Sequence, residues 1–381
     1  MALDEILAGS RVLVCLGPGG VGKTTSAAAL AIAAALSGRR VAVLTVDPAA
    51  RLKDALSLPD AAGEFHRVPL PEGTEGTLDA LLLDAKGLFD ELVRRLAPSP
   101  ALAERVLANP VYRNVAGAFA GSDAYMALEQ LLDVVAGDRF DLVVVDTPPA
   151  SHALELFDAP ERILALLNSR ALEYLGEPVR ILGVATSRLA RGLLSAVLAA
   201  LERLTGLSLL ADVSALARDF GGVSPGFRER AEAIHRLLRE PRTRYVLLTA
   251  PDPHATHDVV AFAAELARAR IRCDAVLVNR VLSLEHLELG ETGARTTATG
   301  PARWPASLSR KLVECRRDLA GLAEAQRTVI ERLRDGMARI DALPPRWLEL
   351  PALFPAPTSL AGVVTLAQVL RSDGARSTTA A

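Results

Sequence analysis

A glycine-rich segment carries the residues best suited to phosphate chemistry. Residues 17–24, Gly-Pro-Gly-Gly-Val-Gly-Lys-Thr, satisfy the pattern GxxxxGK[ST]. Glycines in such a turn leave backbone N–H groups free to point at phosphate oxygens, and the positive end of a following helix adds to this attraction. We expect Lys23 to reach the β- and γ-phosphates of ATP, Thr24 to bind Mg²⁺ through its hydroxyl, and Thr25 to contact the α-phosphate. The predicted nucleotide-binding residues of this turn are Gly17, Gly19, Gly20, Val21, Gly22, Lys23, Thr24 and Thr25.

Two carboxylates follow apolar segments of the kind that form buried strands. Asp47 comes directly after residues 41–46, and Asp146 ends residues 142–146. Because open α/β sheets bind ligands at the carboxyl ends of their strands, both are candidates for the same magnesium site. Asp146 is expected to hold a Mg²⁺-bound water, and Asp47 could approach the metal through a water or orient the attacking water. The alternative role of Asp47 is the N-cap of a short helix over residues 49–52.

These assignments define the predicted chemistry. The predicted catalytic residues are Lys23, Asp47 and Asp146, the predicted metal ligands are Thr24, Asp47 and Asp146, and the predicted cofactors are ATP and Mg²⁺. Two prolines at 148 and 149 restrict the loop after Asp146, so that it can move as a unit when the γ-phosphate leaves. His152 in that loop could sense the nucleotide or a partner, or could make only a local hydrogen bond.

Apolar runs and helical patterns alternate along the chain. Buried strands are predicted at residues 11–16, 41–46, 142–146, 245–249 and 275–279, with further candidates at 78–83 and 347–350. Helical patterns occupy residues 24–36, 87–96, 124–135, 257–269 and 311–334. The glycine-rich turn lies between a buried strand and a helix, which favours a phosphate-binding loop over a plain tight turn. The alternation predicts an α/β fold, a doubly wound and mostly parallel sheet of the P-loop NTPase type with a helical insertion.

The predicted organisation is a single P-loop ATPase domain over residues 1–381. Its core covers residues 10–160, 241–290 and 344–370, and the helical insertion covers residues 161–240, where no convincing strand pattern occurs. A flexible loop is predicted at 290–300 and a disordered tail at 371–381. The insertion has two interpretations: a helical layer that completes the fold, or a groove for an apolar client, partner or membrane surface.

The amino-acid composition and net charge argue against several classes of protein. Half of the 381 residues are hydrophobic, and the formal net charge is −2 at pH 7. Such a chain lacks the bulk positive field of nonspecific nucleic-acid binders, so no nucleic-acid partner is expected. The three cysteines, at 15, 273 and 315, form no CxxC pair, which favours reduced thiols. The acidic start and the short apolar run at 24–38 predict neither a signal peptide nor a membrane span, so we expect a soluble cytoplasmic protein.

The three motifs together resemble those of the arsenite-pump ATPase (ArsA) family. The matching segments are Gly17–Thr25 (GPGGVGKTT), Val46–Ala49 (VDPA) and Asp146–His152 (DTPPASH), and Leu81–Val93 is most similar to bacterial ArsA-like proteins. The family includes the ATPase that delivers tail-anchored membrane proteins, and it belongs to a broader group of dimeric P-loop proteins similar to MinD. The resemblance implies that Asp47 lies in switch I and that residues 146–152 form switch II. It further implies that Asn279 contacts adenine and that Pro351 belongs to the nucleotide site.

Two departures from the family pattern affect the expected partners. The family's second P-loop residue is a lysine that reaches the phosphates of the other subunit, but here it is Pro18. A homodimer would lack both of these lysines, which predicts either slow hydrolysis or a paralogous partner that supplies the missing lysine. The chain also has no cysteine between positions 16 and 272. Thiolate binding of a metalloid and a zinc bridge between subunits are therefore not expected.

The leading interpretation is a Mg²⁺-dependent ATPase that works at a homo- or hetero-dimer interface. Its cycle would drive anion or metalloid transport or another membrane-associated process. One alternative is a targeting factor or chaperone whose insertion binds hydrophobic or tail-anchored proteins. The other is a regulatory subunit that hydrolyses ATP poorly because of Pro18.

Overall fold

The computed structural model describes most of the chain. The described residues are 2–46, 51–59, 63–113, 123–167, 209–282, 306–340, 345–353, 356–372 and 376–378. Asp47 and the loop predicted at 290–300 lie outside them. Of the predicted insertion at 161–240, the structure describes residues 161–167 and 209–240.

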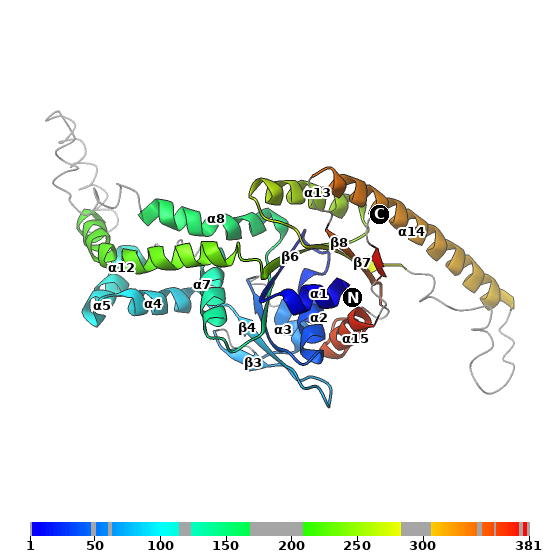
Figure 1. The fold of residues 1–381 in the computed structure, drawn as a ribbon, viewed down its shortest axis with the longest axis horizontal. Coiled ribbons are helices and arrows are strands. Elements are labelled where there is room, and N and C mark those ends of the chain that lie inside the picture. The colour runs from blue at the N-terminus through cyan, green and yellow to red at the C-terminus, as the bar shows by residue number, and fades with distance from the viewer. Residues whose placement is uncertain are drawn as a thin grey trace.

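One twisted sheet organises the described residues (Figure 1). Its strands run in the order β3-β4-β2-β5-β1-β6-β7-β8-β9. Neighbours pair in parallel except at the two edges, where β3 is antiparallel to β4 and β9 is antiparallel to β8. The strands are β1 (Val12–Leu16), β2 (Arg40–Thr45), β3 (Phe65–Arg67), β4 (Thr77–Leu82), β5 (Leu142–Asp146), β6 (Thr243–Thr249), β7 (Ala275–Val281), β8 (Arg346–Pro351) and β9 (Arg376–Thr378). The predicted doubly wound, mostly parallel sheet is confirmed.

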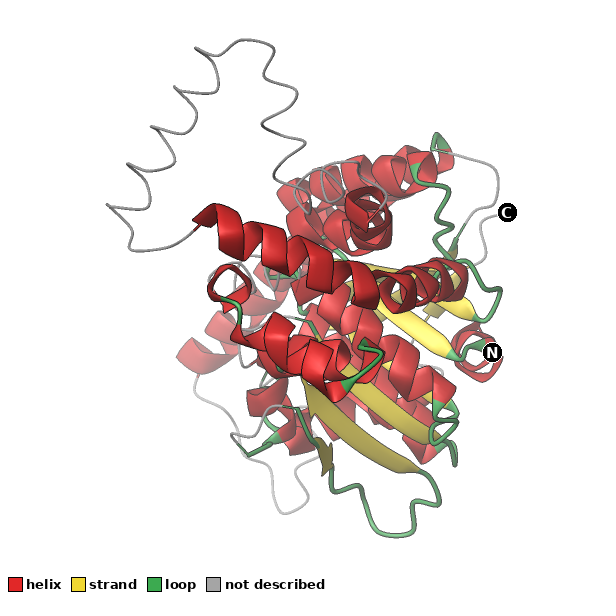
Figure 2. Cartoon of the chain, turned by 90° about the vertical axis from the view of Figure 1, so that its left-hand side faces the viewer, coloured by secondary structure: helices red, strands yellow, loops and turns green. Residues whose placement is uncertain are grey.

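Helices cover both faces of this sheet, as Figure 2 shows for the strands drawn in yellow. Side chains alternate along each strand, so Leu13 and Cys15 of β1 pack on one face, whereas Val12 and Val14 pack on the other. The first face is covered by α1 (Ala2–Gly9), α2 (Lys23–Leu36), α3 (Arg51–Leu56) and α15 (Leu360–Arg371). The apolar cluster on the second face includes side chains of α4 (Ala85–Leu96), α5 (Pro100–Ala108), α7 (Asp123–Ala136), α8 (Ala150–Leu167), α12 (Leu209–Leu237), α13 (Pro253–Arg268) and α14 (Ala306–Ala338). Because both faces of the sheet are buried, the side chains on both sides of its central strands are mostly apolar.

The helix that follows the glycine-rich turn packs unusually closely. Residues 27–35 of α2, almost all alanine, are completely buried. Small side chains let α2 approach both the sheet and α15, and alanine has the highest helix propensity of all residues. This packing holds the amino end of α2 in a fixed position at the edge of the sheet.

Several helices form a layer to one side of the sheet. In Figure 1, α4, α5, α8 and α12 extend together away from the strands. The layer therefore includes segments before β5 as well as part of the predicted insertion, and its helices share apolar contacts with the second face of the sheet. None of the helices in the described parts of the chain is both long and apolar enough to cross a bilayer.

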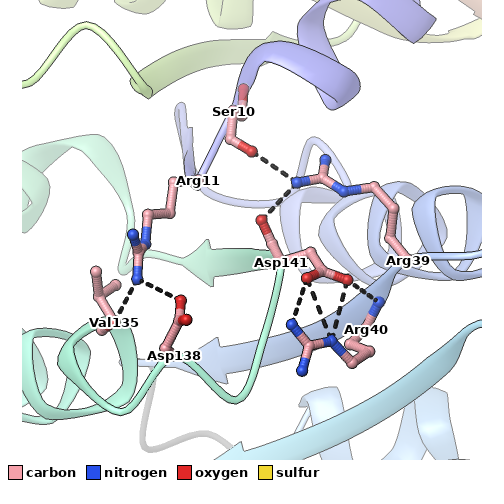
Figure 3. A network of polar contacts seen from close by, with 7 residues as sticks. All are labelled: Ser10, Arg11, Arg39, Arg40, Val135, Asp138 and Asp141. Atoms are coloured by element: carbon pink, nitrogen blue, oxygen red, sulfur yellow. Dashed lines mark hydrogen bonds and ion pairs between the residues drawn. The ribbon is translucent and has the colours of Figure 1, made fainter.

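Arginine side chains fix the amino-terminal edge of the sheet (Figure 3). The guanidinium of Arg39 donates hydrogen bonds to the backbone carbonyls of Leu7, Ser10 and Asp141, with 2.8 Å between Nη2 of Arg39 and the Ser10 oxygen. The neighbouring Arg40 pairs with the Asp141 carboxylate and holds the pKa of that carboxyl below its ordinary value. This network joins α1, β2 and the start of β5, at the edge opposite to the glycine-rich turn.

The carboxyl-terminal segment differs from the sequence-based prediction. We expected a disordered tail over residues 371–381, but α15 continues to Arg371 and residues 376–378 form β9. The physical reason is that β8 would otherwise expose a row of unpaired backbone groups at the edge of the sheet. Helices α1 and α5 and strand β3 were not predicted from the sequence, whereas the candidate strands at 78–83 and 347–350 are confirmed as β4 and β8.

Candidate nucleotide-binding site

The glycine-rich turn joins β1 to α2 at the carboxyl edge of the sheet. Gly17 has φ +148°, and a Cβ built on it would lie 2.2 Å from the carbonyl oxygen of Leu248 in β6. Gly22 has φ +91° and directly precedes α2. Both conformations favour glycine strongly, and the close approach at Gly17 leaves no room for a side chain. The turn is therefore fixed against the neighbouring strand.

Backbone amides of this turn provide a cradle for an anion. The N–H groups of Gly19, Gly20, Val21 and Gly22 have no hydrogen-bond acceptor among the described residues. Successive amides with free N–H groups at the start of a helix are the donor set that binds phosphate oxygens. The residues present therefore fit the polyphosphate of a nucleotide.

Lys23 and Asp146 bring opposite charges to the same place. Lys23 is 8% exposed, and its Nζ donates to the carbonyl oxygen of Pro18 at 2.9 Å. Asp146 is fully buried at the end of β5, opposite Cys15 of β1 and Thr45 of β2, and the Thr45 hydroxyl lies 3.4 Å from its Oδ2. Burial raises the pKa of the Cys15 thiol, the nearby Asp146 carboxylate raises it further, and Lys23 partly opposes them. Both charges therefore act on the strand beneath the turn.

The segment after Asp146 is bonded directly to the turn. The Thr147 hydroxyl donates to the Cys15 carbonyl at 2.7 Å, and the N–H of Ala150, where α8 begins, donates to the Gly17 carbonyl at 3.0 Å. These two hydrogen bonds would therefore transmit a conformational change in the turn to the start of α8. The side chain of His152 lies outside what the structure describes.

Oxygen ligands suitable for magnesium meet at this edge. Thr24 lies in the first turn of α2, and the Asp146 carboxylate belongs to the adjacent strand β5. Hydroxyl and carboxylate oxygens are the ligands that Mg²⁺ prefers, so these two residues could hold it. Asp47, the third predicted ligand, lies two residues after the end of β2 at Thr45 and is not among the described residues.

Asn279 also approaches the turn, although 258 residues separate it from its partner there. Its Nδ2 donates to the Val21 carbonyl at 2.9 Å, and its Oδ1 accepts a hydrogen bond from the N–H of Arg280 at 3.0 Å. Its side chain thus braces the turn, which the sequence analysis did not foresee. Pro351 is buried at the end of β8, opposite Val281 of β7, so it shares the carboxyl edge of the sheet.

The three cysteines lie in separate parts of the structure. Cys15 is buried in β1, Cys273 precedes β7, and Cys315 is exposed on α14. Burial raises the pKa of Cys273 to about 12. The described residues contain no group of three or more His, Cys, Asp or Glu side chains placed to hold a metal ion.

A parallel sheet with this glycine-rich loop, a buried lysine at the start of the next helix and an acid at the end of the adjacent strand define a P-loop nucleotide-binding protein. Comparison with known families gives the closer assignment. The family model described as "Anion-transporting ATPase" (ArsA_ATPase) matches residues 10–210, and the chain belongs to this family. The family resemblance inferred from the motifs is thereby confirmed, whereas the placement among bacterial ArsA-like proteins stays a prediction.

Curated relatives of the chain share about a third of its residues or fewer over the aligned segments. The chain is 27% identical to an ATPase ASNA1 homolog of Trypanosoma cruzi, over 70% of this chain and 73% of the relative. It is 31% identical to an uncharacterized protein of Streptomyces coelicolor, over 71% of this chain and 63% of the relative. It is 32% identical to the ATPase GET3 of Chaetomium globosum, over 38% of this chain and 41% of the relative. The match thus spans less than two thirds of the second relative and less than half of the third.

Proposed function

We propose that this chain binds Mg²⁺-ATP in the loop Gly17–Thr25 and hydrolyses it. The observation that carries the proposal is the set of amides from Gly19 to Gly22, which lack acceptors within the described residues. They belong to the turn that leads into Lys23, at the edge of the sheet where Asp146 ends β5. Membership of an ATPase family supports it. The proposal explains why a lysine and a carboxylate are buried at the same edge of the sheet.

Each residue has a defined role in this proposal. Lys23, which now donates to the Pro18 carbonyl, would turn its ammonium group to the β- and γ-phosphate oxygens. Thr24 and Asp146 would hold Mg²⁺, which when bound supplies positive charge between the terminal phosphates. Asp47 would orient the attacking water. Asn279 would keep the loop in its binding conformation through Val21.

Replacement of Thr24 by valine tests the metal site. The wild-type protein is expected to bind Mg²⁺-ATP in calorimetry and to release phosphate, while Thr24→Val should require about 10- to 100-fold more Mg²⁺ for half-maximal turnover, because one metal ligand is lost. Thr328→Val on α14 is the matched control, since its exposed hydroxyl bonds only within its own helix. Well-folded wild-type protein that binds no Mg²⁺-ATP would disprove the function. An unchanged Mg²⁺ requirement in Thr24→Val would disprove this metal ligand.

We further propose that hydrolysis occurs in a dimer and that its cycle serves a hydrophobic or tail-anchored protein client. The motif resemblance to the family that includes the ATPase delivering tail-anchored proteins supports such a client, and two of the relatives are named ATPase GET3 and ATPase ASNA1 homolog. The separation of the cysteines points the same way, because burial raises the pKa of both Cys15 and Cys273 and so disfavours the thiolates that a metalloid needs. Arsenite added to the Mg²⁺-ATP assay should therefore leave the rate of ATP hydrolysis unchanged. Stimulation by arsenite would favour the hypothesis of metalloid transport.

Pro18 gives a direct test of the dimer. Pro18 stands where the resemblance implies a lysine that acts on the other subunit, so Pro18→Lys should raise turnover by about 10²- to 10³-fold if ATP brings two copies together. Pro18→Ala is the matched control, because it removes the proline ring without adding a charge. Sedimentation with and without ATP reports assembly. A monomer under both conditions with unchanged turnover in Pro18→Lys would contradict the dimer. Assembly only with a lysine-bearing paralogue would identify a hetero-dimer.

A further inference from the structure

The strand β7 bends next to the phosphate-binding loop. Its pairing with β8 shifts register between Val278 and Val281, so the two residues between them, Asn279 and Arg280, leave the regular ladder. Such bulges turn side chains in new directions and are frequent beside binding sites. Here the bulge lies at the carboxyl edge of the sheet, where the glycine-rich turn also lies.

Arg280 holds an unfavourable backbone conformation at this bulge. Its φ is +64°, in the left-handed region, and it alone among the described non-glycine residues with positive φ lies inside a strand. Side chains disfavour this region, so such a conformation persists only where its surroundings impose it. Neighbouring groups do so here: Asn279 accepts a hydrogen bond from the N–H of Arg280, and Gln326 of α14 accepts one from Leu282 at 2.7 Å and donates one to the Arg280 carbonyl at 3.4 Å.

The result is a guanidinium placed beside the loop. A Cβ built on Gly22 would lie 2.5 Å from Nδ2 of Asn279 and 3.8 Å from Nη2 of Arg280. Arg280 is exposed, and its guanidinium has no hydrogen-bond or ion-pair partner among the described residues. By contrast, Arg39 and Arg230 both have partners. A strained backbone that presents an unpartnered cation to a phosphate-binding loop indicates a ligand of negative charge.

We propose that Arg280 binds the polyphosphate of the nucleotide, as a cation supplied by the same chain that supplies the loop. This inference rests on the proposed function. It adds a positive charge on the Gly22 side of the loop, whereas Lys23 lies against Pro18. Because Arg280 is a fork of N–H donors with a permanent charge, it suits phosphate oxygens particularly well. The nucleotide contact is with the phosphates and not with the base or the ribose.

Three variants separate the charge from the backbone. Arg280→Gly removes the guanidinium and also relieves the left-handed strain, because glycine adopts this conformation freely. Arg280→Gln removes only the charge, and Arg280→Lys retains it without the fork. Arg242→Gln is the matched control, since Arg242 is an exposed arginine at the amino end of β6, on the opposite edge of the sheet.

Affinities for ADP and for pyrophosphate, each measured by displacement of a fluorescent ADP analogue from the full chain, provide the test. Arg280→Gly and Arg280→Gln should weaken both ligands by about 10-fold or more, with a smaller loss in Arg280→Lys and none in Arg242→Gln. The thermal unfolding midpoint of Arg280→Gly should equal or exceed that of the wild type. Salt should weaken ADP binding less in Arg280→Gln than in the wild type, because one ionic contact is absent.

Other outcomes would overturn the inference. Unchanged affinity of Arg280→Gln for ADP would show that the guanidinium does not touch the nucleotide. A loss for ADP with unchanged pyrophosphate binding would place the contact on the base or ribose and reject the phosphate assignment. Wild-type protein that binds neither ligand would instead disprove the proposed function, so the two failures are distinguishable.

Discussion

Lys23→Ala is expected to lower ATP turnover by about 10²- to 10³-fold, because positive charge beside the transferring phosphate dominates this type of catalysis. Lys23 is nearly buried at the start of α2. Its present hydrogen bond to the Pro18 carbonyl joins two ends of the loop. Its removal should therefore weaken the binding of Mg²⁺-ATP as well as its hydrolysis, and calorimetry together with phosphate release measures both.

An exposed lysine supplies the control for this experiment. Lys311 lies on α14 and is exposed, so Lys311→Ala should leave turnover and binding unchanged. Circular dichroism and the thermal unfolding midpoint establish that Lys23→Ala remains folded. If folded Lys23→Ala binds Mg²⁺-ATP with the heat and affinity of the wild type, the glycine-rich loop is not the nucleotide site and the proposed function is wrong.

Arg230→Met is expected to lower the free energy of unfolding by about 3–5 kcal/mol, the range found when one partner of a buried ion pair is removed. Arg230 of α12 pairs with Glu129, which is 1% exposed on α7, and donates to Asp133 at 2.7 Å. Burial raises the pKa of the Glu129 carboxyl, although Tyr125 and Arg230 favour its ionised form. Without Arg230, the carboxylate would be buried with no ion-pair partner in the described part of the chain. Urea denaturation at pH 7 measures the loss.

The pH dependence of this variant has a defined sign. A carboxyl whose pKa is raised in the folded state stabilises the fold below its unfolded pKa, and that contribution is lost as pH rises through the folded value. Loss of Arg230 raises the folded pKa of Glu129 further, so the deficit of Arg230→Met should be smallest near the ordinary value of 4.5 and grow toward neutral pH. A deficit independent of pH would contradict this explanation.

Two further variants separate charge from packing. Glu129→Met combined with Arg230→Met should recover much of the lost stability, because an apolar pair can replace a buried ion pair at little cost. Arg105→Met removes a partly exposed pair with Asp219 that also joins helices of the same layer. Its effect should be much smaller, since solvent screens such pairs. Equal losses in Arg105→Met and Arg230→Met would show that burial does not set the strength of these pairs.

The sequence was most informative where local rules decide the structure. The loop at residues 17–24 carries its own glycines, and the alanine-rich segment after it has a high intrinsic propensity for helix. Asp146 could be placed because an acid at the end of an apolar strand must reach the carboxyl edge of a parallel sheet. These positions depend on neighbours in the chain and on sheet geometry, so they follow from spacing alone.

Contacts between distant segments could not be predicted in this way. The bond from Asn279 to Val21 spans 258 residues, and Arg230 meets Glu129 across 101 residues. Arg280 was missed for a different reason, because no residue preference indicates a left-handed arginine inside a strand. Such features follow from how the sheet order brings β7 beside the loop, and only the assembled fold reveals them.

Because the three thiols lie in different environments, one of them can be labelled selectively for spectroscopy. Cys15 is buried in β1, and burial favours the protonated thiol of both Cys15 and Cys273. Cys315 is exposed to solvent on the long helix α14, which extends away from the sheet in Figure 1. Alkylating dyes react with accessible thiolates, so they would select Cys315 in the unaltered protein. A fluorophore there would report on movements of α14, the helix whose Gln326 braces the bulge at Arg280, without any engineered cysteine.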